Sequence, residues 1–93
     1  MDEVRFAGTI RYWKPEQASG LAVVDVPEDR VSALGGLRQQ RVHGTIGRAP
    51  FTSNVMPAGG GRLALSVSKA MMQAAGVGVG DAVEVAITRV GKG

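Results

Sequence analysis

The chain has 93 residues, of which 44% are hydrophobic, and a formal net charge of +3 at pH 7. A chain of this length forms one domain, because it buries too little surface to build two cores. It contains no cysteine, which excludes disulfides, zinc–thiolate sites and thiol catalysis. No apolar run reaches the length of a membrane span, so we expect a cytoplasmic protein that has no membrane partner.

The first third of the chain predicts two strands and a helix. Residues 4–13 alternate between apolar and polar side chains, as a half-buried strand does, and Pro15 ends that strand in a turn. Residues 21–26 are apolar on both faces at nearly every position and predict a central strand. Pro27 then begins a short helix, and the glycine pair at 35–36 ends it.

A hairpin is predicted in the middle of the chain. Residues 41–46 and 51–56 each have the pattern of a strand, and the turn between them is expected at residues 47–50. A second turn, rich in glycine, is expected at residues 57–61.

The last third of the chain carries the clearest pattern. Residues 62–67 predict a strand, and Ser68 suits the N-cap of a helix over residues 69–75 that Gly76 ends. A tight turn then leads to a final strand at residues 82–87. The glycines of this turn follow a helix and precede a strand, which is the reverse of the order in a dinucleotide fingerprint. We expect the Asp81 side chain to bond backbone amides of the turn.

A shift of 41 residues places residues 26–46 over residues 67–87 without a gap. The glycines that end the two helices coincide, and so do the inward-facing Val42 and Val83. Backbone geometry determines such positions, so we interpret the sequence as one strand–helix–strand unit written twice.

The fold class we expect is mainly β with two short helices. It is a double-split, pseudo-twofold β-barrel of about six strands, whose helices cap the ends, because neither unit could bury its apolar face alone. Residues 1–93 form the single domain, with the repeats at about 20–48 and 61–89.

Acidic residues are absent from Arg30 through Gly80. If the basic residues of this segment share a face, that face attracts an anionic partner. The alternative is that the fold returns Asp25 or Glu84 to the arginines and cancels their field. The basic residues are Arg30, Arg38, Arg41, Arg48, Arg62 and Lys69.

Three blocks of the sequence, taken in order, resemble a small bacterial family that is defined only as a domain of unknown function. The blocks are VPEDRVSALGG (residues 26–36), VHGTI with PF after it (residues 42–51) and MPAGGGRLALSVSKAMMQAAGVGVGDAVEVAI (residues 56–87). The resemblance runs from about Phe6 to Ile87. Members of the family occur alone or fused ahead of a YdeI/OmpD-associated domain.

This resemblance implies a double-split β-barrel related in architecture to AbrB and MazE, in which two chains each supply one half of the barrel. Here the two halves would be joined in one chain. The chain departs from the family where Gly44 to Arg48 read Gly-Thr-Ile-Gly-Arg in place of the usual Gly-Thr-Ile-Asn-Gly, so an arginine enters the loop. We expect no second domain after Gly93, and we expect any function that needs one to be absent or supplied by another chain.

Three groups of residues are candidates for a binding site. His43 is the only histidine and alternates with Arg41 and Thr45 along a strand, so it is either a surface histidine or a general base. The Gly59–Gly61 turn, Arg62, Ser68 and Lys69 would bind an anion if the turn folds over the helix start, although a turn also needs glycines for backbone reasons alone.

Tyr12 and Trp13 form the third group, with Arg11 and Lys14 beside them. This strand end is either a stacking edge for a base, a sugar or a peptide, or a part of the core.

The sequence contains no nucleophile with a base, no metal-binding set and no phosphate-binding motif, so we expect no catalytic residues, no metal and no cofactor. The function we expect is a non-enzymatic barrel module that binds a small molecule or a protein partner. The alternative is DNA binding in the manner of AbrB, through Arg41, Arg48 and Arg62 on the barrel face, and an uncharacterised enzyme comes third. We expect a monomer or a loose homodimer, because fused halves have less need of a partner chain.

Overall fold

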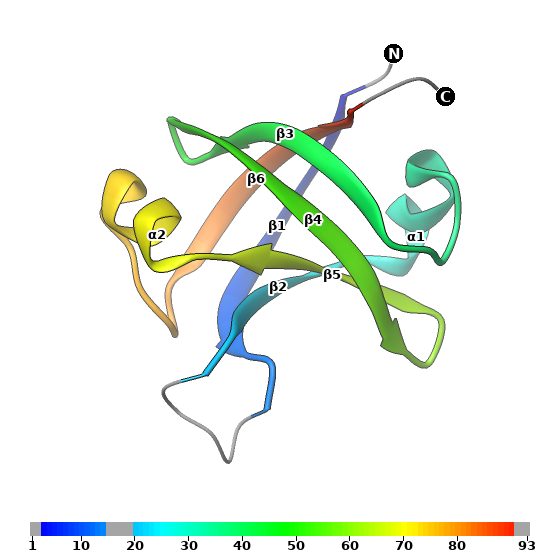
Figure 1. The fold of residues 1–93 in the computed structure, drawn as a ribbon, viewed down its shortest axis with the longest axis horizontal. Coiled ribbons are helices and arrows are strands. Elements are labelled where there is room, and N and C mark those ends of the chain that lie inside the picture. Colours follow the sequence, from blue (N-terminus) through cyan, green and yellow to red (C-terminus); the bar gives the residue numbers. More distant parts are fainter. Residues whose placement is uncertain (1–2, 15–19, 91–93) are drawn as a thin grey trace.

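The computed structural model describes residues 3–14 and 20–90. In this part of the chain, six antiparallel strands close into one barrel in the order β1-β2-β5-β4-β3-β6, with a short helical segment at each end (Figure 1). The mainly β barrel with two short helices is therefore confirmed. The turn expected at Pro15 and the last three residues lie outside the described ranges.

The bounds of the elements follow the predicted periodicity closely. The strands are β1 (Val4–Tyr12), β2 (Ala22–Val26), β3 (Gln40–Ile46), β4 (Ala49–Gly59), β5 (Arg62–Val67) and β6 (Ala82–Arg89). The helices are α1 (Glu28–Val31), which η1 (Ser32–Leu34) continues as a 3-10 helix, and α2 (Lys69–Ala75).

The core fills the inside of the barrel with aliphatic side chains. Alternate residues of every strand point inward, and Ile10, Ile46 and Leu65 are among those that are fully buried. Leu34 of η1 and Met71 of α2 are buried at the two ends of this cluster. Burial of each large aliphatic side chain contributes roughly 1.5–3 kcal/mol, so the barrel and its two end helices form one cooperative unit.

The two helical segments end in the same way. Gly35 and Gly76 adopt the left-handed conformation, with φ of 87° and 70°. After each glycine, the next amide donates to the carbonyl five residues earlier, which belongs to Val31 in one segment (3.1 Å) and Met72 in the other (3.0 Å). Glycine at these positions satisfies the last helical carbonyls without the steric cost of a side chain.

Strand pairing relates the two helical segments to each other. β2 pairs with β5 at Val24 and Leu65, and β3 pairs with β6 at Thr45 and Ala86. The partners in both pairs are 41 residues apart, which is also the offset between the two glycines that end the helices. Pairing therefore places residues at this offset directly opposite each other, in β2 and β5 and again in β3 and β6.

β4 is longer than predicted at both ends. The expected turn at residues 47–50 is limited to Gly47 and Arg48, and the expected turn at residues 57–61 begins only after Gly59. Pro50 is tolerated because β5 pairs with β4 only from Val55 onward, so the nitrogen of Pro50 needs no strand partner on that side. Pro57 lies at a register shift, where a bulge replaces regular pairing.

Gly44 determines how closely β3 approaches β6. A Cβ atom there would overlap the backbone of Ala86 and lie 2.9 Å from the Cα atom of Ile87.

We therefore expect Gly44→Ala to push β3 and β6 apart and lower the free energy of unfolding by at least about 2 kcal/mol, as measured by urea denaturation. Gly78→Ala is the matched control, since no atom lies within 4 Å of a Cβ at Gly78. Equal losses in the two variants would contradict this account of the β3–β6 contact.

Candidate ligand-binding groove at the α2 end of the barrel

Three strand ends meet beside the start of α2. Tyr12 is the last residue of β1 and pairs with Ala22, the first residue of β2. Ala22 also pairs with Val67, the last residue of β5. Ser68 and Lys69 follow directly, so barrel closure brings Tyr12 next to residues that are more than fifty positions away in the sequence.

A groove lies between these strand ends and α2. One part of it has a volume of about 400 Å³, and an adjoining part of about 350 Å³ shares Tyr12, Lys69, Met72 and Val79 with it. We call the two parts together the α2 groove. Among the described residues that line it, Lys69 is the only charged one. The other lining residues are Gly20, Leu21, Ala22, Val67, Ser68, Gln73, Val77 and Gly78.

The turn that carries Val79 is fastened to β1. The amide of Gly80 donates to the carbonyl of Ile10 (2.8 Å), and the amide of Ile10 donates to the carbonyl of Asp81 (3.0 Å). The Asp81 carboxylate accepts from the amide of Gly78 at 2.8 Å, which confirms the predicted role of this side chain. Val79 is therefore held beside Tyr12 although 38% of its surface is exposed.

Ser68 serves as the N-cap of α2. Its Oγ accepts from the amide of Met71 at 3.1 Å, and its own amide donates to the Met71 sulfur at 3.4 Å. The predicted anion site is not assembled, because the Gly59–Gly61 turn and Arg62 lie at the far end of β5 on the side of α1 (Figure 1). A strand of this length separates its ends by about 17 Å at roughly 3.3 Å per residue.

An ion pair holds the end of β1 in place. The Arg11 guanidinium donates to both oxygens of Asp25, at 2.8 Å each, and to the carbonyl of Tyr12 at 3.1 Å. The hydrogen bond from Arg11 lowers the pKa of Asp25, and the charge of Arg62 adds a weaker effect in the same direction. Asp25 is therefore neutralised mainly by Arg11, which lies outside the acid-free segment.

The other predicted site residues lie elsewhere. Trp13 follows Tyr12, and its amide donates to the carbonyl of Leu21 at 2.6 Å, but its side chain does not line the α2 groove. Arg41 and His43 are exposed on β3, and Arg48 is exposed at the tip of the β3–β4 hairpin. Only Tyr12, Ser68 and Lys69 of the predicted set come together in the groove.

Sequence reasoning missed the apolar wall of the groove. The sequence pattern predicts Leu21 within a strand and Val79 only as part of a turn, whereas 45% of the Leu21 surface is exposed at the groove. A large apolar side chain directly next to a turn glycine is the signal that both residues share.

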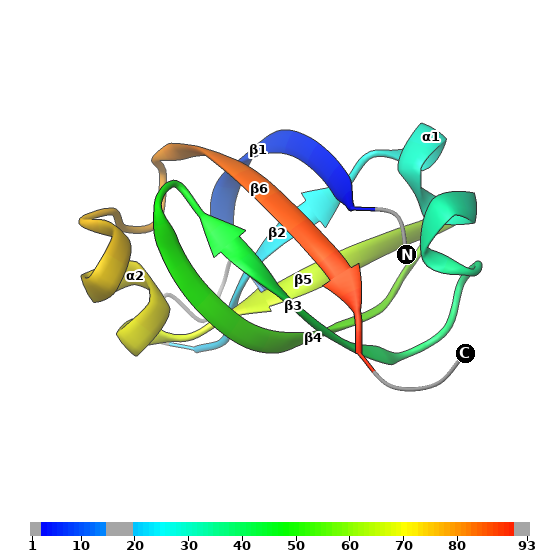
Figure 2. The same ribbon diagram turned by 90° about the horizontal axis from the view of Figure 1, so that it is seen from above.

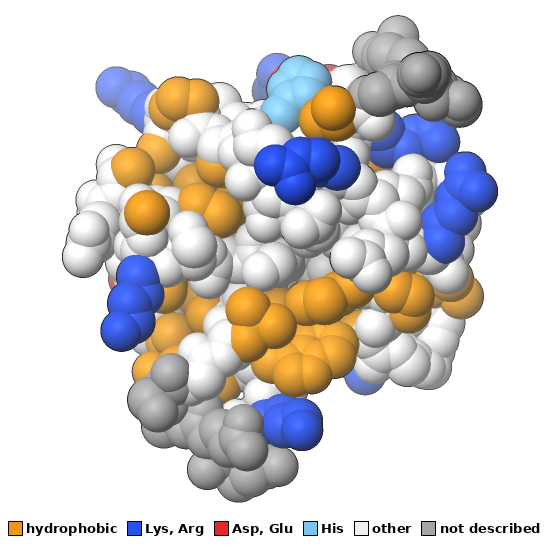
Figure 3. All heavy atoms as spheres, viewed as in Figure 1, with side chains coloured by type: hydrophobic (Ala, Val, Ile, Leu, Met, Phe, Trp, Pro, Cys, Tyr) orange, Lys and Arg blue, Asp and Glu red, His pale blue; other side chains and the backbone are white. Residues whose placement is uncertain are grey.

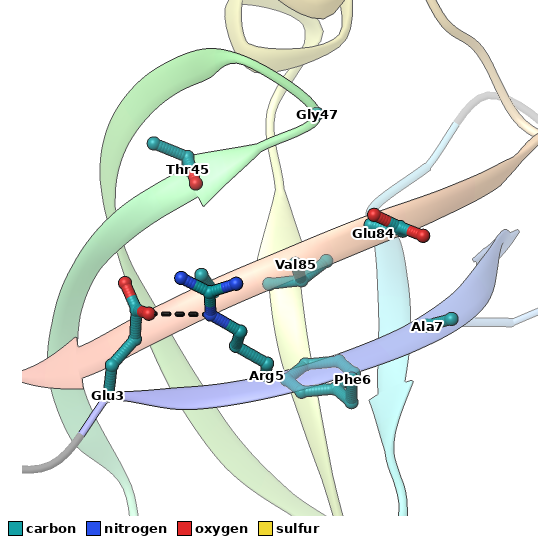
Figure 4. Close-up of a pocket in the computed structure, with 9 residues that line it drawn as sticks. Glu3, Arg5, Phe6, Ala7, Thr45, Gly47, Glu84 and Val85 are labelled. Atoms are coloured by element: carbon teal, nitrogen blue, oxygen red, sulfur yellow. Dashed lines mark hydrogen bonds and ion pairs between the residues drawn. The ribbon is translucent and has the colours of Figure 1, made fainter.

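A second hollow, of about 500 Å³, lies on the outer face of β1, β6 and β3 (Figure 4). Glu3 and Arg5 form an ion pair of 2.7 Å beside it, and Glu84 lines it from β6. The hydrogen bond with Glu3 and the charge of Glu3 raise the pKa of Arg5, and the charge of Glu84 adds a smaller effect. The small residues Ala7, Thr45, Gly47 and Ala86 also line this hollow.

Comparison with known families identifies the chain. The sequence profile of a domain of unknown function, DUF1905, matches residues 6–87. The chain belongs to the DUF1905 family. The matched span includes every residue that lines the α2 groove. Comparison with curated proteins found no match to this DUF1905 domain.

In the described ranges of this DUF1905 domain, no helix is long and apolar enough to cross a membrane. No group of three or more His, Cys, Asp or Glu side chains there is placed to hold a metal ion.

The Arg11–Asp25 pair predicts a pH-dependent stability. Because folding lowers the pKa of Asp25, the pair stabilises the fold above the unfolded pKa of about 4, and this contribution is lost as the pH falls through the folded pKa. We expect Asp25→Asn to lower the urea midpoint at pH 7 and to approach the wild-type midpoint near about pH 2. Glu84→Gln, at a carboxylate with no ion pair among the described residues, should change the midpoint little at either pH. If the urea midpoints of wild type and Asp25→Asn differed by the same amount at both pH values, the ion pair would not be the cause of the difference.

Proposed function

We propose that this DUF1905 domain is a non-enzymatic binding module whose α2 groove holds a small molecule with an apolar body and an anionic group. The volume of the groove lies in the range of roughly 300–1,000 Å³ that is typical of small-molecule sites. The observation that carries the proposal is that the exposed side chains of Leu21 and Val79 line the same groove as Lys69. A ligand with an apolar body and an anionic group would place its body against the apolar wall and its anionic group near Lys69.

The opposite end of the barrel supports this proposal. At the offset of 41 residues, Leu21 corresponds to Arg62, Val79 to Arg38 and Lys69 to Glu28. A helical segment covers each end of the barrel although these exposed residues differ, so the fold itself does not require apolar side chains at these positions. We further propose that the two strand–helix–strand segments are copies of one repeat, fused as an AbrB-like or MazE-like pair of halves would be, and that only one copy acquired the groove.

Duplex DNA is the alternative ligand, and the charge distribution gives it less support. Arg41 and Arg48 lie on the β3–β4 hairpin, whereas Arg62 lies at the start of β5. Basic side chains on the face seen in Figure 3 are set apart from one another and form no stripe that would follow a phosphate backbone.

The proposal also includes a cytoplasmic location without a membrane partner. A separate chain would supply any function of a YdeI/OmpD-associated domain.

Matched alkyl probes test the proposed ligand class. Decanoate and decylamine share an apolar body and differ in the sign of the head group, so we expect decanoate to bind more tightly. Binding is measured through the methyl NMR signals of Leu21, Met72 and Val79. We expect Lys69→Glu to weaken decanoate binding by about threefold to tenfold, which corresponds to about 0.7–1.4 kcal/mol for loss of an exposed charge interaction and its replacement by repulsion.

Arg62→Glu is the control, because it makes the same change of charge at the other end of β5. It should leave decanoate binding unchanged. The proposal fails if neither probe shifts these signals, or if Arg62→Glu weakens binding as much as Lys69→Glu does. A mobility shift of duplex DNA that disappears steeply with added salt, without any response to decanoate, would favour the DNA alternative.

A further inference from the structure

Four neighbouring strands present a continuous outer face that does not include the α2 groove. Figure 2 looks onto this face, where β6 and β3 lie side by side between β1 and β4. In the pairing register, the outward residues of the central row are Arg5, Ala86, Thr45 and Pro50. We call this surface the four-strand face. Its middle consists of small side chains, and the hollow of about 500 Å³ lies there (Figure 4).

The charges of the four-strand face are divided between its two sides. On the side of β1 and β6, Glu84 is exposed and has no basic partner among the described residues, while Glu3 and Arg5 neutralise each other. On the side of β3 and β4, Arg41 and Arg48 are exposed, and neither has an acidic partner in the described ranges. One side is therefore net acidic and the other net basic.

We propose that the four-strand face binds the same face of a second copy of this chain and forms a two-fold symmetric homodimer. A two-fold axis that runs along the strands between β6 and β3 exchanges the acidic side of one copy with the basic side of the other. Glu84 of each copy then faces the Gly47–Arg48 turn of the other copy. This charge complementarity is what selects a second copy as the partner.

The shape of the face fits this arrangement. Ala7, Thr45 and Ala86 offer only short side chains at the centre, so the two sheets can approach without displacing large groups. Gly47 and Glu84 lie on the rim of the hollow, which gives the Arg48 side chain of the second copy a place beside a carboxylate. Arg5 would lie opposite Pro50 of the second copy, where it meets no like charge.

Charge reversal with complementation tests the dimer. We expect sedimentation velocity to show a wild-type dimer that weakens at high salt, because salt screens exposed charge pairs. Glu84→Lys and Arg48→Glu should each weaken self-association at least about tenfold, since each places like charges opposite each other. An equimolar mixture of the two variants should associate again, because the lysine introduced at position 84 in one variant then faces the glutamate introduced at position 48 in the other.

Arg62→Glu lies outside the four-strand face and should leave association unchanged. All of the substituted side chains are exposed, and circular dichroism checks that each variant is folded. The proposal is overturned if the wild type stays monomeric at the highest soluble concentration in low salt, if single reversals have no effect, or if the mixture fails to associate. None of these outcomes depends on ligand binding in the α2 groove, so the two proposals are tested separately.

Discussion

Barrel closure through β6 is the constraint on which the rest of the structure depends. β6 pairs with β1 along one side and with β3 along the other, and the absence of a side chain at Gly44 allows the second contact. Closure also determines where the segment before β6 must lie, because the Gly78–Asp81 turn is bonded to Ile10 of β1. The apolar wall of the α2 groove therefore forms as a consequence of sheet pairing. A change far from the groove that separates β3 from β6 would also disturb Val79.

The two ends of the barrel show how one scaffold carries different surfaces. Both helical segments use the same glycine-based termination and bury a residue in the shared core, Val31 in one and Met71 in the other. The exposed residues around them are free to differ, since the core does not contact them. One end has arginine where the other has leucine, and that difference separates a charged end from an end that has an apolar groove. The chemistry of the site is therefore carried by positions on which the fold places no demand.

The sequence predicted the elements better than it predicted the site. Period-2 alternation and helix-ending glycines are local signals, so the strands and both helices were found within a few residues. The extension of β4 through Pro50 was missed, because a proline is acceptable in a strand only where the neighbouring strand has already diverged, and that divergence is a tertiary feature. The anion site required the Gly59–Gly61 turn to fold over Ser68, and this condition is not met because β5 holds the two apart. The meeting of Tyr12 with Lys69 depends on the register of three strands, which no local pattern contains.

The α2 groove and the four-strand face occupy different parts of the barrel and rely on different physical effects. The groove removes apolar surface of a ligand from water and uses one cation for orientation, whereas the four-strand face matches charges across a centre of small side chains. A homodimer formed through the face would leave the groove of each copy open, because none of the residues that line the groove belongs to the outward row of β6 or β3. Two grooves in one assembly would bind ligands independently unless the ligand moves β1 or β6. β1 contributes to both surfaces, through Tyr12 at one end and Arg5 at the other, and β6 follows directly after the turn that carries Val79. Any coupling between ligand binding and dimer formation would therefore pass along these two strands.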